Sequence, residues 1–340
     1  MAMRDRVFTV LRLAALFLAI ALTTSRLTLV LHELVGHGAM VKAVGAELLR
    51  YHLFWFAGGF VEFTRAEPYT LAEEMAIFLG GITLEIALGV MVFLIARRTR
   101  PGSIARIGLF GYAAIVLVHA GYYLTAGTFH GFGDGQILYR EMGDARLALV
   151  LPVTAFVLVA AHAMARHWVA HVASRLPATG PPLLTIAIAV VLAAGGHAAL
   201  SFGELAIRPD LTYENTMRHE SEHAVEHDLA IFIKAIEMAR GEQPADHELS
   251  RRRHELRETH GDFPFSRVFI AMLAVAILTG VRRSRTLRLP ATRTDPAPEV
   301  SDDSPAVESD DRSIQWRDVA IPGALTAASL VLIAVLKLLQ

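Results

Sequence analysis

The chain has 340 residues, of which 54% are hydrophobic and only 19% are charged. Long apolar segments recur along it, which is typical of membrane-spanning helices and excludes an ordinary soluble protein. The net charge of −1 gives no indication of nucleic-acid binding, and the absence of cysteine excludes disulfides, thiolate metal sites and a cysteine nucleophile. Any metal ion must therefore be held by His, Asp or Glu.

The apolar segments predict an all-α polytopic membrane protein. About 20 apolar residues cross a bilayer. The first two segments form either two helices or one bent helix, so we expect seven or eight transmembrane helices in a multi-pass protein of the cell or inner membrane. Residues 1–21 resemble a signal peptide but lack a convincing cleavage site, so we interpret them as a retained helix. The segments lie near 7–24, 27–44, 74–96, 106–127, 145–166, 183–203, 264–281 and 319–339.

The segments between these helices predict a short hairpin and one sizeable polar insertion. Residues 46–65 are rich in aromatic and branched residues around Gly58 and Gly59, which is typical of a hairpin or membrane-edge loop. The insertion reads as two helices, about 214–240 and 245–258. The predicted organisation is a core at 1–168, a further transmembrane region at 169–203, an extramembrane helical insertion at 204–263, a transmembrane helix at 264–281, a disordered linker at 282–318 and a C-terminal transmembrane helix at 319–340.

Arginines set the expected orientation of the chain. The clusters at 97–106, 166–175 and 282–288 favour the cytoplasm, which places the 204–263 insertion outside. Arg4 and Arg6 join the cytoplasmic side only if residues 7–44 cross the membrane once. The sequence alone leaves that point open, and with it the side on which the first polar motif opens.

That motif is His32-Glu33-Leu34-Val35-Gly36-His37, inside the apolar segment at 27–44. A His-Glu pair on an apolar helix, with a second His about one turn later, is typical of zinc hydrolases. The two imidazoles hold the metal, and the Glu takes a proton from water and passes it to the leaving amine. Ionisable residues are costly in lipid and indicate a functional site.

The spacing of the two histidines makes a structural demand. Five residues on an ideal α-helix turn about 500°, which separates the side chains by about 140°. A π-bulge absorbs one extra residue and returns both side chains to one face. Gly36 makes such a distortion easier. We therefore expect a π-bulge near Gly36.

A third ligand is needed, and Asp134 in Gly133-Asp134-Gly135-Gln136 is the best candidate. A carboxylate between two glycines, ahead of the next apolar segment, can approach a metal ion closely. The predicted site is therefore Zn²⁺ held by His32, His37 and Asp134, with Glu33 as the catalytic residue.

With these motifs, residues 20–165 resemble the site-2 protease family of intramembrane zinc metalloproteases. The matching parts are the His-Glu helix, the aromatic hairpin at 52–63 and the Asp-Gly motif at 133–136. The resemblance implies two His and a Glu on one membrane helix, with a later Asp as third zinc ligand. These carry over to His32, His37, Glu33 and Asp134. The Gly-Pro-x-x-Asn element of the family stands here as Gly-Gly-Ile-Thr-Leu-Glu at 80–85.

A second motif, His219-Glu220-Ser221-Glu222-His223, has the four-residue zinc spacing, and His227 extends it. Its surroundings are acidic and polar, so we interpret it as a solvated surface helix, with a regulatory or metal-sensing site and the catalytic site as the alternatives. The isolated polar residues Glu85, His119, His162 and His197 lie in apolar segments, where we expect interhelical hydrogen bonds.

Three functions follow as hypotheses. The first is a zinc-dependent intramembrane endopeptidase, a hydrolase that cleaves membrane-embedded or membrane-adjacent segments of membrane protein substrates within the lipid bilayer. The second is a metal transporter or sensor that uses the intramembrane His and Asp with the external His-rich helix; transporters often contain repeated halves, and no repeat is visible here. The third is an inactive relative of the proteases. The sequence indicates no substrate identity, pathway or oligomeric state.

Overall fold

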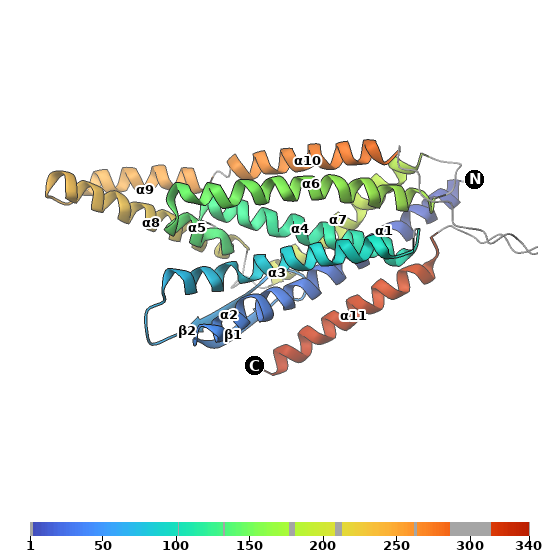
Figure 1. Ribbon diagram of the computed structural model, residues 1–340, viewed down its shortest axis with the longest axis horizontal. Coiled ribbons are helices and arrows are strands. Elements are labelled where there is room, and N and C mark those ends of the chain that lie inside the picture. The colour runs from blue at the N-terminus through green and yellow to red at the C-terminus, as the bar shows by residue number, and fades with distance from the viewer. Residues whose placement is uncertain are drawn as a thin grey trace, which may run out of the picture.

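The structure is a computed structural model that describes residues 3–100, 102–131, 133–176, 181–207, 213–261, 264–285 and 314–339. Long helices dominate it, and within these ranges a two-stranded hairpin is the only sheet (Figure 1). Six helices of the described chain are long and apolar enough to cross a membrane. The predicted all-α polytopic membrane fold is confirmed, with six such helices where the sequence predicts seven or eight.

Two differences account for the lower number. The first two apolar segments are one continuous helix, formed by α1 (Met3–Val30), the π-helix η1 (Leu31–His37) and α2 (Gly38–Ala43). Helix α10 (Pro264–Ser284) is not among the six. The side chains at the start of α10 lie outside the described residues, so the transmembrane helix predicted at 264–281 stays a prediction; in the structure α10 packs along α6.

The chain leaves the first helix through the predicted hairpin. Strand β1 (Glu47–Leu53) pairs antiparallel with β2 (Gly59–Thr64), with a register shift between Leu48 and Arg50. Helix α3 (Leu71–Arg98) follows and begins at a capping box in which Thr70 and Glu73 satisfy each other's backbone N–H groups. Helix α4 (Ile104–His130) returns along it and ends at Gly131.

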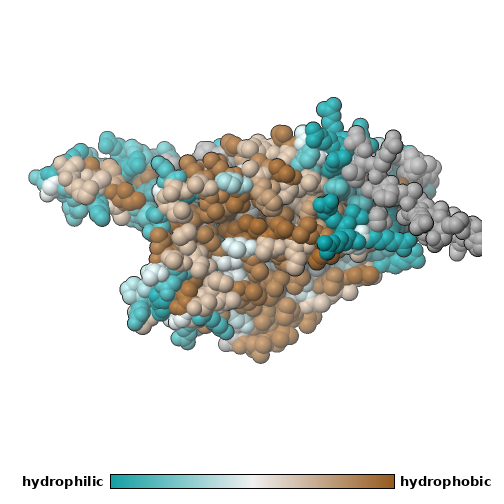
Figure 2. Space-filling model, in the orientation of Figure 1, coloured by the Kyte–Doolittle hydropathy of each residue, from teal (hydrophilic) through white to brown (hydrophobic). Residues whose placement is uncertain are grey.

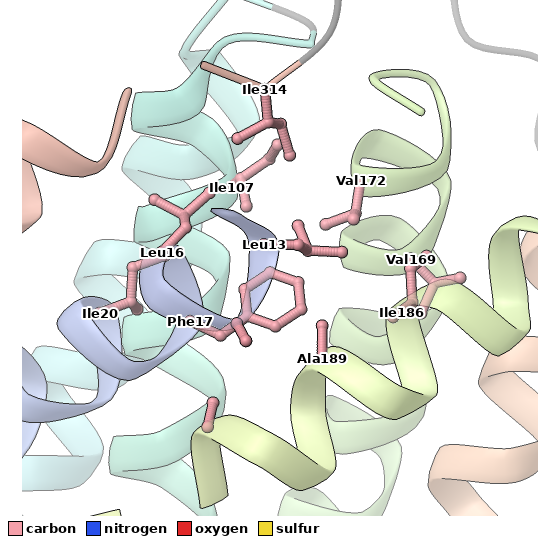
Figure 3. Packing of buried hydrophobic residues seen from close by; sticks show 12 residues of the cluster. Leu13, Leu16, Phe17, Ile20, Ile107, Val169, Val172, Ile186, Ala189 and Ile314 are labelled. Atoms are coloured by element: carbon pink, nitrogen blue, oxygen red, sulfur yellow. The ribbon is translucent and has the colours of Figure 1, made fainter. Parts of the chain in front are cut away.

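The middle of the molecule is a bundle built on α1. Helix α7 (Pro182–Ile207) packs beside it with α4, α6 (Arg146–Ala173) packs against α4 and α7, and α11 (Trp316–Leu338) covers another side of α1. Figure 3 shows apolar side chains of α1 pointing toward those of α4, α6 and α7. Because lipid tails are as apolar as these side chains, close van der Waals packing, more than removal from water, holds the helices of the bundle together. The buried members include Leu13, Leu16, Phe17, Ile20, Ile107, Val169, Val172, Ile186 and Ala189.

Several short elements connect these helices at one end of the bundle. The 3₁₀ turn η2 (Gly133–Gly135), helix α5 (Gln136–Glu141) and the 3₁₀ turn η3 (Gly143–Ala145) lead from α4 into α6. The insertion forms a helical hairpin, α8 (Tyr213–Arg240) and α9 (Asp246–Gly261), close to the predicted bounds. In Figure 1 it projects from the same end of the bundle as the β-hairpin.

Some predicted boundaries shift. The boundaries after 168 and after 203 fall inside α6 and α7, which run to Ala173 and Ile207. The predicted linker at 282–318 is helical at both ends, because α10 runs to Ser284 and α11 begins at Trp316. Residues 286–313 of that linker lie outside the described residues.

Polar and apolar surfaces are separated along the bundle. In Figure 2 a broad hydrophobic band covers the middle of the visible face, with hydrophilic residues at both ends. The amino terminus, the end of α3 and the end of α6 share the end opposite the β-hairpin (Figure 1). Because residues 4–43 are one helix, Arg4 and Arg6 lie at the same end as the arginines of 97–106. This removes the conflict in the arginine pattern, and the location of that end in the cytoplasm stays a prediction of the positive-inside rule.

Candidate metal centre

The two motif histidines lie on one face because the helix is a π-helix between Leu31 and His37. The N–H of Gly38 donates to the carbonyl of Glu33, five residues earlier, as this wider turn requires. The rings of His32 and His37 meet edge to face, with centroids 4.8 Å apart and their Nε2 atoms 3.1 Å apart. The predicted π-bulge is confirmed, and it converts a five-residue spacing into a shared face.

Glycines let α3 approach this π-helix at backbone contact. A Cβ added to Gly36 would lie 2.6 Å from the Cα of Gly81, and one added to Gly81 would lie 2.5 Å from the His32 ring. Real Cβ atoms do not come so close to other atoms. The His32 imidazole therefore lies flat against a site on α3 that only glycine leaves open, and this contact fixes the position of the ring.

The Asp134 carboxylate joins the two histidines from the far end of α4. Gly131 ends that helix at φ 65°, and Gly133 repeats a positive φ of 55°, a conformation that glycine adopts without a steric penalty. The chain thereby turns back, and Asp134 Oδ2 lies 2.9 Å from His32 Nε2, with Oδ1 3.3 Å from His37 Nε2. The structure brings together all three predicted ligands.

The remaining ring nitrogens determine which atoms are free to bind an ion. His32 Nδ1 lies 2.9 Å from Glu85 Oε1, and His37 Nδ1 lies 2.7 Å from the carbonyl oxygen of Ile77. A carbonyl and a carboxylate accept hydrogen bonds, so each Nδ1 donates. In neutral rings both Nε2 atoms then carry lone pairs, and no hydrogen lies between these two atoms, which are 3.1 Å apart.

This arrangement fits a metal ion. Asp134 Oδ2 is buried and makes no hydrogen bond of acceptable geometry, although it lies so close to His32 Nε2. Lone pairs that converge on a shared point, instead of on one another, are what a coordinated ion requires. Zinc bonds of 2.0–2.1 Å in a tetrahedron put neighbouring ligand atoms about 3.3 Å apart, close to the 2.9–3.3 Å found between these three side chains. The buried group of His32, His37 and Asp134 can hold a metal ion.

Glu33 lies directly beside the ligands. Its side chain is buried in the π-helix, and the first residue of β2 lies against it: a Cβ on Gly59 would come within 3.4 Å of Glu33 Cγ. The hairpin therefore covers the Glu33 side of the site. The sequence motif predicts Glu33 as the catalytic residue, and that role stays a prediction.

The other intramembrane polar residues make the interhelical hydrogen bonds that the sequence predicts. Glu85 of α3 contacts His32 and also His119 of α4, at 3.0 Å. His162 of α6 contacts Thr279 of α10, and His197 of α7 contacts Ser25 of α1.

Two features of the site are missed by sequence reasoning: the Gly81 slot under His32 and the Ile77 carbonyl that anchors His37. The only sequence signal for the Gly81 slot is a small residue one turn before Glu85. No sequence signal identifies the Ile77 carbonyl as the partner of His37.

Comparison with protein-family models, curated proteins and solved structures finds no match to this chain. The resemblance to site-2 proteases thus stays a prediction, and the function is argued from the geometry.

The second histidine motif lies in α8. The side chains of His219 and His223 lie outside the described residues, so the alternative of a sensing site there stays a prediction. His227 is described, and its ring lies near that of Tyr139 in α5, with centroids 6.5 Å apart.

Proposed function

We propose that this protein is a zinc-dependent intramembrane endopeptidase that cleaves membrane-embedded or membrane-adjacent segments of membrane protein substrates. The observation that carries the proposal is the buried convergence of His32, His37 and Asp134 beside a buried glutamate, Glu33. The first helix supplies two ligands and the glutamate, and the turn after α4 supplies the third ligand.

The donor set supports zinc as the ion. Zinc takes imidazole nitrogen and carboxylate oxygen, and its catalytic sites combine three protein ligands with one open position. Two histidines and one carboxylate also suit Fe²⁺ in oxygenases. The glutamate next to the first histidine distinguishes the two, because hydrolysis requires a base at that place and oxygen chemistry does not. The zinc ion, when bound, supplies Lewis acidity toward the scissile carbonyl.

The residues of the chain supply the rest of the reaction. The Glu33 carboxylate accepts a proton from the attacking water and delivers it to the leaving amine. Glu85 and the Ile77 carbonyl hold the Nδ1 atoms of the two histidines, so that the Nε2 lone pairs stay directed into the site. The Gly81 slot fixes the ring plane of His32.

The position of the site along α1 supports cleavage near the outer membrane face. His32 lies about 40 Å along the helix from Arg4 at 1.5 Å per residue, whereas the hydrocarbon core is about 30 Å thick. With Arg4 at the cytoplasmic end, the site lies toward the opposite interface, where the β-hairpin also lies. Water reaches buried groups most easily there, and a substrate would present a bond near the end of its span.

The test is Glu33→Gln in the purified full-length protein, reconstituted in vesicles with a mixed extract of membrane proteins. Glu62→Gln, on the exposed side of β2, is the matched control. We expect one zinc per chain in all three proteins by metal analysis, and new amino termini by mass spectrometry with wild type and Glu62→Gln only. Equal cleavage by Glu33→Gln would rule out the proposed role. Zinc uptake into the vesicles that persists in Glu33→Gln, without any cleavage, would favour transport.

A further inference from the structure

Glu85 is a buried carboxylate in the middle of α3 that contacts histidines of two other helices. Its side chain is 2% exposed. Oε1 lies 2.9 Å from His32 Nδ1, and Oε2 lies 3.0 Å from His119 Nδ1. A carboxylate is costly to bury unless hydrogen-bond donors satisfy it, and here each oxygen has its own histidine donor.

The same face of α3 holds His32 in two independent ways. Gly81 lies one turn before Glu85 and receives the flat side of the His32 ring. Glu85 then fixes the ring's rotation, because it accepts the hydrogen of Nδ1. Together they leave His32 Nε2 directed at Asp134, 2.9 Å away.

The two predicted histidine ligands differ in the group that accepts the hydrogen bond from Nδ1. His37 Nδ1 donates to a neutral backbone carbonyl, that of Ile77, whereas His32 Nδ1 faces a carboxylate. A carboxylate behind a ligating imidazole raises the basicity of the ring and locks its tautomer. The His32 bond to an ion is therefore expected to depend on a side chain, and the His37 bond only on the backbone.

We propose that Glu85 is the positioning residue of the metal centre, and that His119 holds Glu85 in place. The inference rests on the zinc site of the proposed function. His119 can hold Glu85 because its own ring is fixed by packing on Tyr123, with centroids 4.5 Å apart. The His119 side chain is 46% exposed and lies at the edge of the bundle. The chain of contacts runs from the ion ligand His32 through buried Glu85 to a histidine at the edge of the bundle.

The experiment measures zinc itself in the purified full-length protein in detergent. Zinc affinity is obtained by competition with a chromophoric chelator, and the visible spectrum of the cobalt(II) form reports the ligand geometry. Glu85→Ala should lower the affinity about 10–100-fold and alter the cobalt spectrum. Glu85→Gln keeps an acceptor oxygen without the charge, and its loss should be smaller. His119→Ala should fall between Glu85→Gln and wild type.

His162→Ala is the matched control, because its interhelical hydrogen bond, to Thr279, joins α6 to α10, and neither helix supplies a residue to the predicted ligand group. It should leave affinity and spectrum unchanged. If Glu85→Ala does not fold, Glu85→Gln carries the test, since it is nearly isosteric. Wild-type affinity and an unchanged cobalt spectrum in the folded Glu85 variants would overturn the inference, whatever their thermal stability.

The same measurements separate this inference from the proposed function. Wild-type protein that binds zinc but releases no peptide products contradicts the peptidase and leaves the Glu85 comparison intact. Wild-type protein that binds no zinc overturns both.

Discussion

The π-helix at 31–37 and helix α8 both carry a histidine-glutamate motif, in very different surroundings. The π-helix is buried against α3 through glycines, and its two histidines are each anchored at Nδ1. Helix α8 belongs to a two-helix projection whose described core is small, centred on Val225, Leu229 and Leu256. Its described ion pairs are exposed, such as Glu226 with Arg253.

The π-helix brings its histidines together in spite of their longer spacing, so a group that could hold a metal ion does not require the four-residue spacing. The motif with the standard spacing lies on the acidic helix, and the motif with the longer spacing acquires a π-turn that corrects it. Asp134, from the turn after α4, and the fixed Nδ1 partners complete the first group. These long-range contacts, which the motif alone does not specify, hold the three side chains of the first group together.

The largest expected effect separates the two motifs directly. His37→Ala should reduce bound zinc from about one ion per chain to nearly none, because two ligands remain. His227→Ala, on α8, should retain it. Metal analysis of both purified variants after dialysis provides the measurement. Zinc lost from His227→Ala and kept by His37→Ala would reverse the assignment of the site.

A second prediction concerns the glycine slot. Gly81→Ala places a methyl group against the His32 ring, so the ring must move and zinc affinity should fall about tenfold or more. Gly108→Ala is the matched control, since its Cβ would enter open space within α4. That substitution should stabilise the helix by about 0.5–1 kcal/mol. Chelator competition and thermal unfolding measure the two effects. Unchanged zinc affinity in Gly81→Ala would show that the ring tolerates displacement.

A third prediction tests whether the projection influences the site. Tyr139 of α5 lies five residues after Asp134, and it donates a hydrogen bond to Asp228 of α8. Tyr139→Phe should loosen α8–α9, at a cost of about 1 kcal/mol, and speed proteolysis between the two helices. Zinc affinity should stay within about twofold of wild type. A large loss of zinc affinity would mean that the two regions are coupled through α5, and the contrast between them would have to be abandoned.

Local patterns in the sequence predict much of the fold and the identity of the ligands. Apolar length predicts the spans, and Gly241 marks the break between α8 and α9. The demand for a π-turn near Gly36 follows from helix geometry alone. The sequence does not predict that residues 4–43 form one continuous helix, because a polar stretch such as Thr23 to Arg26 is typical of a break between helices.

Tertiary contacts explain why that stretch remains helical. Thr23 bonds to Thr326 of α11, and buried Arg26 donates to the carbonyl of Phe54 in the hairpin. Neither partner is near in sequence. The same holds for the pairing of Glu85 with both His32 and His119, which depends on how three helices pack.

The smallest expected effect lies in the projection and concerns pH. The Arg240 guanidinium, and then the N–H of Ala245, lower the pKa of Glu248 below its usual 4.5. A carboxyl whose pKa is lower in the folded state stabilises that state above pH 4.5, and the contribution disappears as pH falls through the lowered value. Because the group is exposed, solvent and salt screen the effect. Hydrogen-exchange protection of α8–α9, corrected for intrinsic rates, should decline below pH 4.5 in wild type and in Glu242→Gln, and decline less in Glu248→Gln. Equal slopes in all three proteins would assign the acid sensitivity of the projection to other groups, while zinc binding at neutral pH should be the same in each.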